Sequence, residues 1–111
     1  GPAPFYKELG KKFGPIDLGF GNLGAYNFYP IVPVKDKSTA HANPEELLSL
    51  MKDLKVKKVI GMHWGTAILS LEPIWEPPVR FKANAEKNGY KKEDAIIFKI
   101  GEIKKLDDLI N

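Results

Sequence analysis

Two histidines are the side chains of this sequence best suited to ligand or proton chemistry. His63 directly follows the apolar run Val59–Met62, and the carboxyl end of a buried strand is where α/β proteins place their ligands. Neutral imidazole is the commonest metal ligand, but a catalytic zinc ion needs about three protein ligands. Position alone therefore leaves two interpretations of His63, a metal ligand or a hydrogen-bonded structural histidine, and favours the second.

His41 stands two residues before Asn43, which is expected to cap a helix. From there its imidazole can donate to an anionic group near the amino end of that helix, a natural position for binding phosphate. The alternative is an exposed loop histidine, and the spacing alone favours that alternative.

The other reactive side chains predict no chemistry from their spacing. No two carboxylates are placed like an acid/base pair, and no Ser or Thr lies in a nucleophile elbow. The absence of Cys excludes disulfides, thiolate zinc sites and cysteine nucleophiles. Residues 19–24 match G-x-G-x-x-G, but they begin inside an expected strand and lead into an irregular stretch, which excludes a dinucleotide site.

The elements that must position the two histidines are predicted by apolar spacing and by Gly and Pro. Helices are expected at residues 4–13, from Pro44 onward, at 77–88 and within 103–110, and strands at 16–20, 59–62 and 95–100. Residues 55–58 are expected to form a turn, and 21–43 a long irregular loop with Tyr26, Phe28 and Tyr29. Strands that alternate with helices indicate an α/β layer structure.

Two of these elements have strong local signals. Asn43 can cap the helix that begins at Pro44, with Glu46 as the capping-box acid. The strand at 59–62 is apolar on both faces, so we expect it to be central in its sheet.

Length and charge limit the class of protein. The chain has 111 residues with 17 Lys and Arg against 14 Asp and Glu, a net charge of +3. It is expected to form one domain or part of one.

No apolar run approaches the ~20 residues that span a membrane. Because three excess charges are a weak basis for nucleic-acid binding, none is expected. The cytoplasm is the default compartment. Gly1-Pro2 looks like a tag remnant, so residues 1–3 carry no weight.

Several segments, taken in order, point to a known family. They are Phe13–Leu18 (FGPIDL), Gly24–Asn27 (GAYN), His41–Glu46 (HANPEE), His63–Thr66 (HWGT) and Glu76–Pro78 (EPP). In this order and spacing the sequence resembles the carboxyl-terminal part of the metallo-β-lactamase-fold hydrolases related to N-acylphosphatidylethanolamine-hydrolysing phospholipase D. The resemblance extends from about Phe5 to Glu102.

The resemblance implies an α/β fold that is half of an αββα sandwich, one sheet with helices on one face. It also implies a two-metal, usually zinc, centre, although other divalent metals are open. His63 would be the last metal ligand, His41 would contact the phosphate or act as an acid, and Tyr26 would lie on a loop near the site. Two metal ions can clamp a phosphodiester and supply a hydroxide. Trp64 and Gly65 would fix the strand end that aims His63.

The family's main metal motif, H-x-H-x-D-H, is absent from the sequence, as are its next metal histidine and bridging aspartate. Position 67 is Ala where the family often has Phe. We therefore expect residues 1–111 to be the carboxyl-terminal half-domain of a longer hydrolase and to be inactive alone. A half sandwich exposes one face of its sheet, which predicts contact with the missing amino-terminal half or with a second copy.

The expected function is therefore part of a phosphodiesterase of the phospholipase D type. Its substrate would be a phosphodiester or a phospholipid, and peripheral association with membranes stays open. The alternative is a non-catalytic interaction or assembly domain that kept the fold and lost the metal centre. Fold alone does not select among the substrates that such proteins process.

Overall fold

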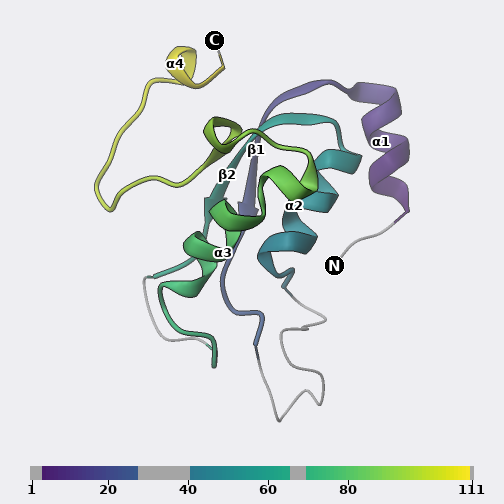
Figure 1. Ribbon diagram of the computed structural model, residues 1–111. Helices are drawn as coiled ribbons and strands as arrows, with labels where there is room; N and C mark the ends of the chain where they lie inside the picture. The colour runs from purple at the N-terminus through teal and green to yellow at the C-terminus, as the bar shows by residue number, and fades with distance from the viewer. Residues whose placement is uncertain (1–3, 28–40, 66–69, 111) are drawn as a thin grey trace.

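Three parallel strands form the single sheet of the computed structural model, which describes residues 4–27, 41–65 and 70–110 (Figure 1). Strand β1 spans Ile16–Asn22, β2 spans Val56–Met62 and β3 spans Ala95–Ile96. Their order in the sheet is β1-β2-β3, and both pairs of neighbours are parallel. The prediction that the apolar strand is central is therefore confirmed.

Helices α2 (Pro44–Asp53) and α3 (Glu76–Asn84) connect the strands. Each follows one strand and precedes its parallel neighbour, as in a βαβ unit. The two helices pack against each other, and α2 also packs against β1 and β2 (Figure 1). The expected α/β class is therefore confirmed, and the arrangement is compatible with half of an α/β sandwich.

The amino end of α2 has the expected capping box. The side chain of Asn43 accepts a hydrogen bond from the backbone N–H of Glu46 at 2.9 Å. In return, the carboxylate of Glu46 accepts from the backbone N–H of Asn43 at 3.4 Å. These reciprocal bonds satisfy two backbone donors that a helix otherwise leaves unpaired, so residues 41–43 enter the helix along a fixed path.

The core lies between the sheet and the helices. Helix α2 comes so close to β1 that a Cβ atom added at Gly21 would lie 2.2 Å from Cδ1 of Leu47. Glycine is therefore required there for close packing. The buried cluster consists of Leu23, Leu47, Leu48, Met51, Val56, Val59, Phe81, Ala85, Tyr90 and Ala95.

The sheet face directed away from the α2 packing carries exposed apolar side chains. Phe20 pairs in register with Ile60, and Asn22 pairs with Met62. Because side chains alternate along a strand, these residues lie opposite to Gly21. Phe20 is 58% exposed and Met62 is 45% exposed, whereas Ile60 is buried at 4%, so the exposed part of this face lies toward the carboxyl ends of β1 and β2.

Two of the predicted elements are wrong in part. Residues 56–58 were expected in a turn, but they belong to β2, and the turn lies at 54–55, where Lys55 has a φ of +57°. The strand expected at 95–100 is only two residues long, because only Ala95 and Ile96 pair with β2. Ile97 still packs on the core, but it does not pair with β2, and the chain then leaves the sheet, so that Ile100 is 85% exposed.

The remaining elements agree more closely with expectation. Helix α1 spans Phe5–Phe13, and the long helix expected at 77–88 divides into α3 and the 3₁₀ turn η1 (Glu86–Asn88), followed by the left-handed Gly89. A second 3₁₀ turn, η2 (Lys92–Asp94), precedes β3. Near the carboxyl end, α4 covers only Leu106–Ile110.

Candidate functional site

His63 lies immediately after the carboxyl end of β2, as the sequence predicted. It is exposed, and its backbone has a φ of +63°. Left-handed backbone at a residue other than glycine is uncommon and costs energy, so it persists where the surroundings impose it. The next residue, Trp64, packs on the core and its ring lies 5.7 Å from that of Trp75. Trp64 therefore anchors the strand end that carries His63.

The imidazole rings of His41 and His63 stack on each other. Their centroids are 5.5 Å apart and their planes differ by 11°. His41 reaches this place because it precedes the capped amino end of α2, and α2 packs on the two strands whose ends lie beside it. The fold therefore brings together two histidines that are far apart in the sequence.

Tyr26 lies on the segment that follows β1, and it is part of the packed scaffold beside the site. Its side chain is fully buried, and its hydroxyl donates to the carboxylate of Glu76 at 2.5 Å. Burial, together with the neighbouring Glu76 carboxylate, raises the pKa of Tyr26 well above its ordinary value. The hydroxyl therefore stays protonated at neutral pH and remains a donor.

Arg80 connects this tyrosine to the beginning of α2. Its guanidinium lies over the ring of Tyr26, 5.1 Å from the centroid. The same group binds the carboxylate of Glu45 through Nε, at 2.8 and 2.9 Å, and through Nη2 at 2.8 Å. Asn84 also donates to Glu45 at 2.8 Å. Such a forked, charge-assisted contact is strong and directional, so it fixes the first turn of α2 against α3.

A second carboxylate holds the backbone around Tyr26. Glu72 accepts from the N–H groups of Ala25 at 2.6 Å and Asn27 at 2.9 Å. Burial alone would raise the pKa of Glu72, but hydrogen bonds from Ser70 and from these backbone amides lower it overall. Glu72 is therefore ionised at neutral pH and acts as an acceptor at both oxygens.

The metal-ligand set expected from the resemblance is incomplete within residues 4–27, 41–65 and 70–110. No group of three or more His, Cys, Asp or Glu residues in these ranges could hold a metal ion. His41 and His63 together supply two imidazoles, one fewer than the smallest protein set of a catalytic zinc site. The residues described here therefore do not fit a complete metal centre.

Spacing along the chain did not identify the residues that support the site. Glu72 and Glu76 flank Pro73–Trp75 in the sequence, a spacing that predicts no acid/base pair. The segments of the resemblance contain two of the supporting carboxylates, Glu45 in HANPEE and Glu76 in EPP. Of the aromatic residues noted in the long loop, Phe28 and Tyr29 lie outside the described residues, as does Ala67.

Comparison with known proteins agrees with part of the resemblance. Over 51 residues, 46% of this chain, it is 47% identical to the mitochondrial N-acyl-phosphatidylethanolamine-hydrolysing phospholipase D of Saccharomyces cerevisiae. Over 61 residues, 55% of this chain, it is 36% identical to N-acyl-phosphatidylethanolamine-hydrolysing phospholipase D 1 of Caenorhabditis elegans. An uncharacterised protein of Mycobacterium bovis is 33% identical over 85 residues, 73% of this chain. No family model matches the chain.

The matched segments cover only a small share of these relatives. They make up 11% of the yeast protein, 16% of the nematode protein and 21% of the mycobacterial protein. The similarity therefore concerns one region of larger proteins, two of which are named as N-acyl-phosphatidylethanolamine-hydrolysing phospholipases D. Among the helices of the described ranges, none has the length and apolar character needed to cross a bilayer.

Proposed function

We propose that this chain is the carboxyl-terminal portion of a metal-dependent hydrolase of the phospholipase D type, which cleaves a phosphodiester and accepts a phospholipid. The observation that carries the proposal is the stacked pair His41 and His63, which joins two segments of the resemblance at the carboxyl end of a parallel strand. Strand ends of this kind are where α/β proteins bind ligands. The similarity to two phospholipases D supports the same reaction class.

His41 is assigned the phosphate contact. An imidazole N–H donates to an anionic oxygen, and a protonated imidazole can also release a proton to a leaving group. The amino end of α2 favours negative charge nearby, because its dipole is positive at that end. Tyr26, with its hydroxyl bonded to Glu76, supports the wall of the site through its ring and its backbone.

His63 is assigned as a metal ligand in the longer protein, where two zinc ions would polarise the phosphodiester and supply the attacking hydroxide. Because the described residues hold no third ligand beside the two histidines, we assign no step of the reaction to a metal within this chain. The other ligands would come from the amino-terminal half. The isolated chain is accordingly expected to be inactive.

The amino-terminal half is also the proposed partner of the open sheet face. Phe20 is 58% and Met62 45% exposed there, so covering each of them removes about half of its surface from water and stabilises an interface by ~1 kcal/mol. The matched relatives have most of their length outside the aligned segment, which is why we choose this occupant over a second copy. Sedimentation of the 111-residue chain tests it: a tight homodimer that Phe20→Lys dissociates would support a second copy instead.

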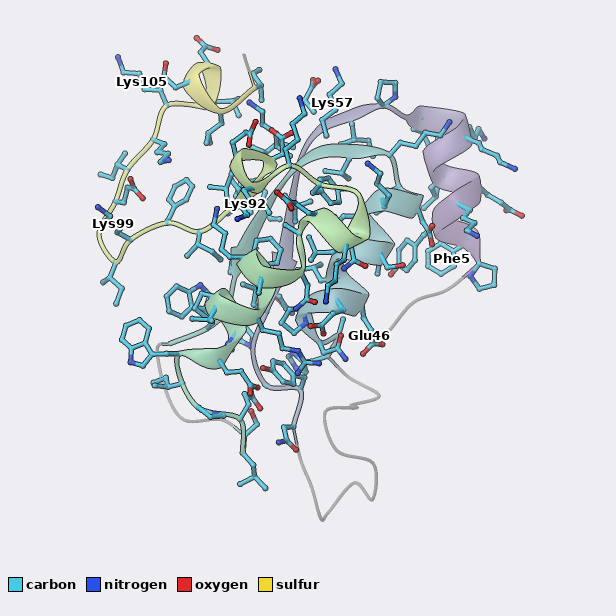
Figure 2. The ribbon with its side chains drawn as sticks, viewed as in Figure 1. Phe5, Glu46, Lys57, Lys92, Lys99 and Lys105 are labelled. Atoms are coloured by element: carbon cyan, nitrogen blue, oxygen red, sulfur yellow. The ribbon has the colours of Figure 1, made fainter. Side chains whose placement is uncertain are left out.

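The function is tested in the longer protein that contains this segment. We would measure bound zinc and the hydrolysis of N-acyl-phosphatidylethanolamine and of bis(4-nitrophenyl) phosphate. His63→Ala should lose zinc and turnover together, and His41→Ala should lose turnover while keeping zinc. The control Lys57→Gln removes an exposed charge near the start of β2, whereas His63 follows the end of that strand, and it should change neither. Lys57 also lies away from Glu46 (Figure 2).

Two outcomes would contradict the proposal. If His63→Ala left both zinc and turnover unchanged, the chain would be better described as the non-catalytic interaction domain. Metal-dependent hydrolysis by the isolated 111-residue chain would refute the assignment of the missing ligands to another part of the protein.

A further inference from the structure

We propose that Glu72 is a positioning residue for His63, which it holds in place through the backbone of residues 24–27. Its consequence for catalysis rests on the proposed function, but its structural part does not. The effect of Glu72 is transmitted through one short segment of main chain.

The carboxylate of Glu72 holds that segment through hydrogen bonds to its backbone. Both of its carboxylate oxygens are used, one by the N–H of Ala25 and the other by the N–H of Asn27. The N–H of Leu71 also donates to the carbonyl oxygen of Asn27 at 2.8 Å. Bonds from backbone amides to an ionised carboxylate are stronger than neutral ones. Residues 71 and 72 therefore fix the segment from both sides of Tyr26.

These hydrogen bonds maintain an unfavourable backbone conformation at Ala25. Ala25 has a φ of +62°, in a region where L-residues with a Cβ atom are disfavoured. Such a conformation persists only where the surrounding structure over-determines it. Because Ala25 itself donates to Glu72, the carboxylate is the group placed to stabilise the left-handed turn.

The same segment also contacts the backbone around His63. The N–H of Leu23 donates to the carbonyl oxygen of Met62 at 2.8 Å. A Cβ atom at Gly24 would lie 2.5 Å from the carbonyl oxygen of His63 and 3.5 Å from the Cα of Trp64. The backbone of residues 23–24 thus lies directly against residues 62–64. A displacement of the first segment has to displace the second.

Ala25 and His63, which both have left-handed backbone, therefore belong to one structural unit. Ala25 follows β1 and His63 follows β2, and these strands are neighbours in the sheet. Glu76 and Arg80 hold the side chain of Tyr26 within the same unit, but among the contacts described above only Glu72 binds the amides on either side of that residue. Replacing one carboxylate oxygen of Glu72 therefore weakens the attachment of this segment most directly, and it leaves both histidines unchanged.

The structural test uses the 111-residue chain, ¹⁵N-labelled, with amide and imidazole resonances assigned. Glu72→Gln keeps the shape and removes one acceptor oxygen. Its matched control is Glu102→Gln, because Glu102 also accepts from a backbone amide, that of Lys99 at 2.9 Å. The segment around Lys99 lies on another side of the molecule from Glu46 (Figure 2).

In Glu72→Gln we expect the amide protons of Ala25 and Asn27 to move upfield, with accompanying shifts in Gly24, His63 and Trp64. The control should perturb Lys99 and leave His63 unchanged. Gly24→Ala is an independent variant, because its added Cβ would overlap the His63 carbonyl oxygen, and it should move the His63 and Trp64 resonances as well. If the Ala25 and Asn27 amides respond in Glu72→Gln while His63 stays unchanged, the positioning role of Glu72 is refuted.

The functional test uses the longer protein. Loss of a group that orients a metal ligand typically lowers metal affinity or activity by ~10–100-fold, and we expect Glu72→Gln to fall in that range with KM for the phosphodiester nearly unchanged. The control Glu102→Gln should keep wild-type kcat. A wild-type protein without hydrolase activity would overturn the proposed function but not the structural result. Wild-type turnover in Glu72→Gln, with His63 displaced, would overturn the catalytic consequence of the positioning.

Discussion

Replacing Tyr26 by Phe removes a single hydroxyl from the buried wall of the candidate site. In the wild type that hydroxyl donates to the Glu76 carboxylate at 2.5 Å, and the tyrosine is fully buried. The ring is retained in the variant, so the contact with the Arg80 guanidinium is expected to persist. The substitution therefore isolates one hydrogen bond between a neutral donor and a charged acceptor.

The size of the effect follows from the surroundings of the two partners. A hydrogen bond to a charged group contributes ~1.5–3 kcal/mol to stability. The side chain of Glu76 is 38% exposed, so water can solvate its carboxylate when the hydroxyl is removed, which places the expected loss near the lower limit, at about 1.5 kcal/mol. For a domain of this length, each kcal/mol of lost stability lowers Tm by roughly 4 °C.

Urea denaturation followed by circular dichroism measures this change in the free energy of unfolding. Tyr90→Phe is a matched control, because the Tyr90 hydroxyl donates to the backbone carbonyl of Val56 at 2.7 Å and lies away from the site. Tyr26→Phe should also change the His63 environment seen by NMR, whereas Tyr90→Phe should lower stability without doing so. A loss below about 0.5 kcal/mol for Tyr26→Phe would refute the argument, since it would equal a neutral surface change.

Three further predictions concern stability. Because the folded pKa of Glu72 is lowered, its contribution is complete above the ordinary Glu pKa of ~4.3 and is lost as pH falls through the folded value; unfolding at pH 3 to 6 should show a shallower pH dependence in Glu72→Gln. Gly21→Ala should destabilise by ~1–3 kcal/mol, because the added Cβ would overlap Leu47, and unchanged thermal denaturation would contradict this. Asn43→Ala should cost ~1 kcal/mol through loss of the helix cap, as measured by urea denaturation.

Local signals predicted most of the elements but not all of their bounds. Asn43-Pro44 marked the start of α2 correctly, because capping depends on residues adjacent in sequence. The lysines at 57 and 58 favoured a turn, yet Lys58 pairs with Leu18 inside the sheet. Tertiary pairing therefore outweighed local polarity at the start of β2. At β3 the opposite occurred, because apolar residues beyond Ile96 found no partner strand.

Sequence spacing identified the two histidines but could not show that they meet. Their stacking depends on how α2 packs against β1 and β2, which is a property of the whole fold. The supporting contacts were harder still to predict. Glu76 lies 50 residues from Tyr26 in the sequence, and Arg80 lies 35 residues from Glu45. No periodicity or motif relates partners at such separations.

The left-handed backbone of His63 also has an evolutionary consequence. With φ at +63°, position 63 accepts Gly without conformational cost, accepts Asn, Asp or His at a smaller cost than other residues, and strongly disfavours Val, Ile and Thr. A lineage freed from selection for the imidazole should therefore drift toward Gly or Asn at this position, which would also relax the strand end. Retention of His across distant descendants would then report selection on the imidazole itself, since the backbone conformation alone permits its loss.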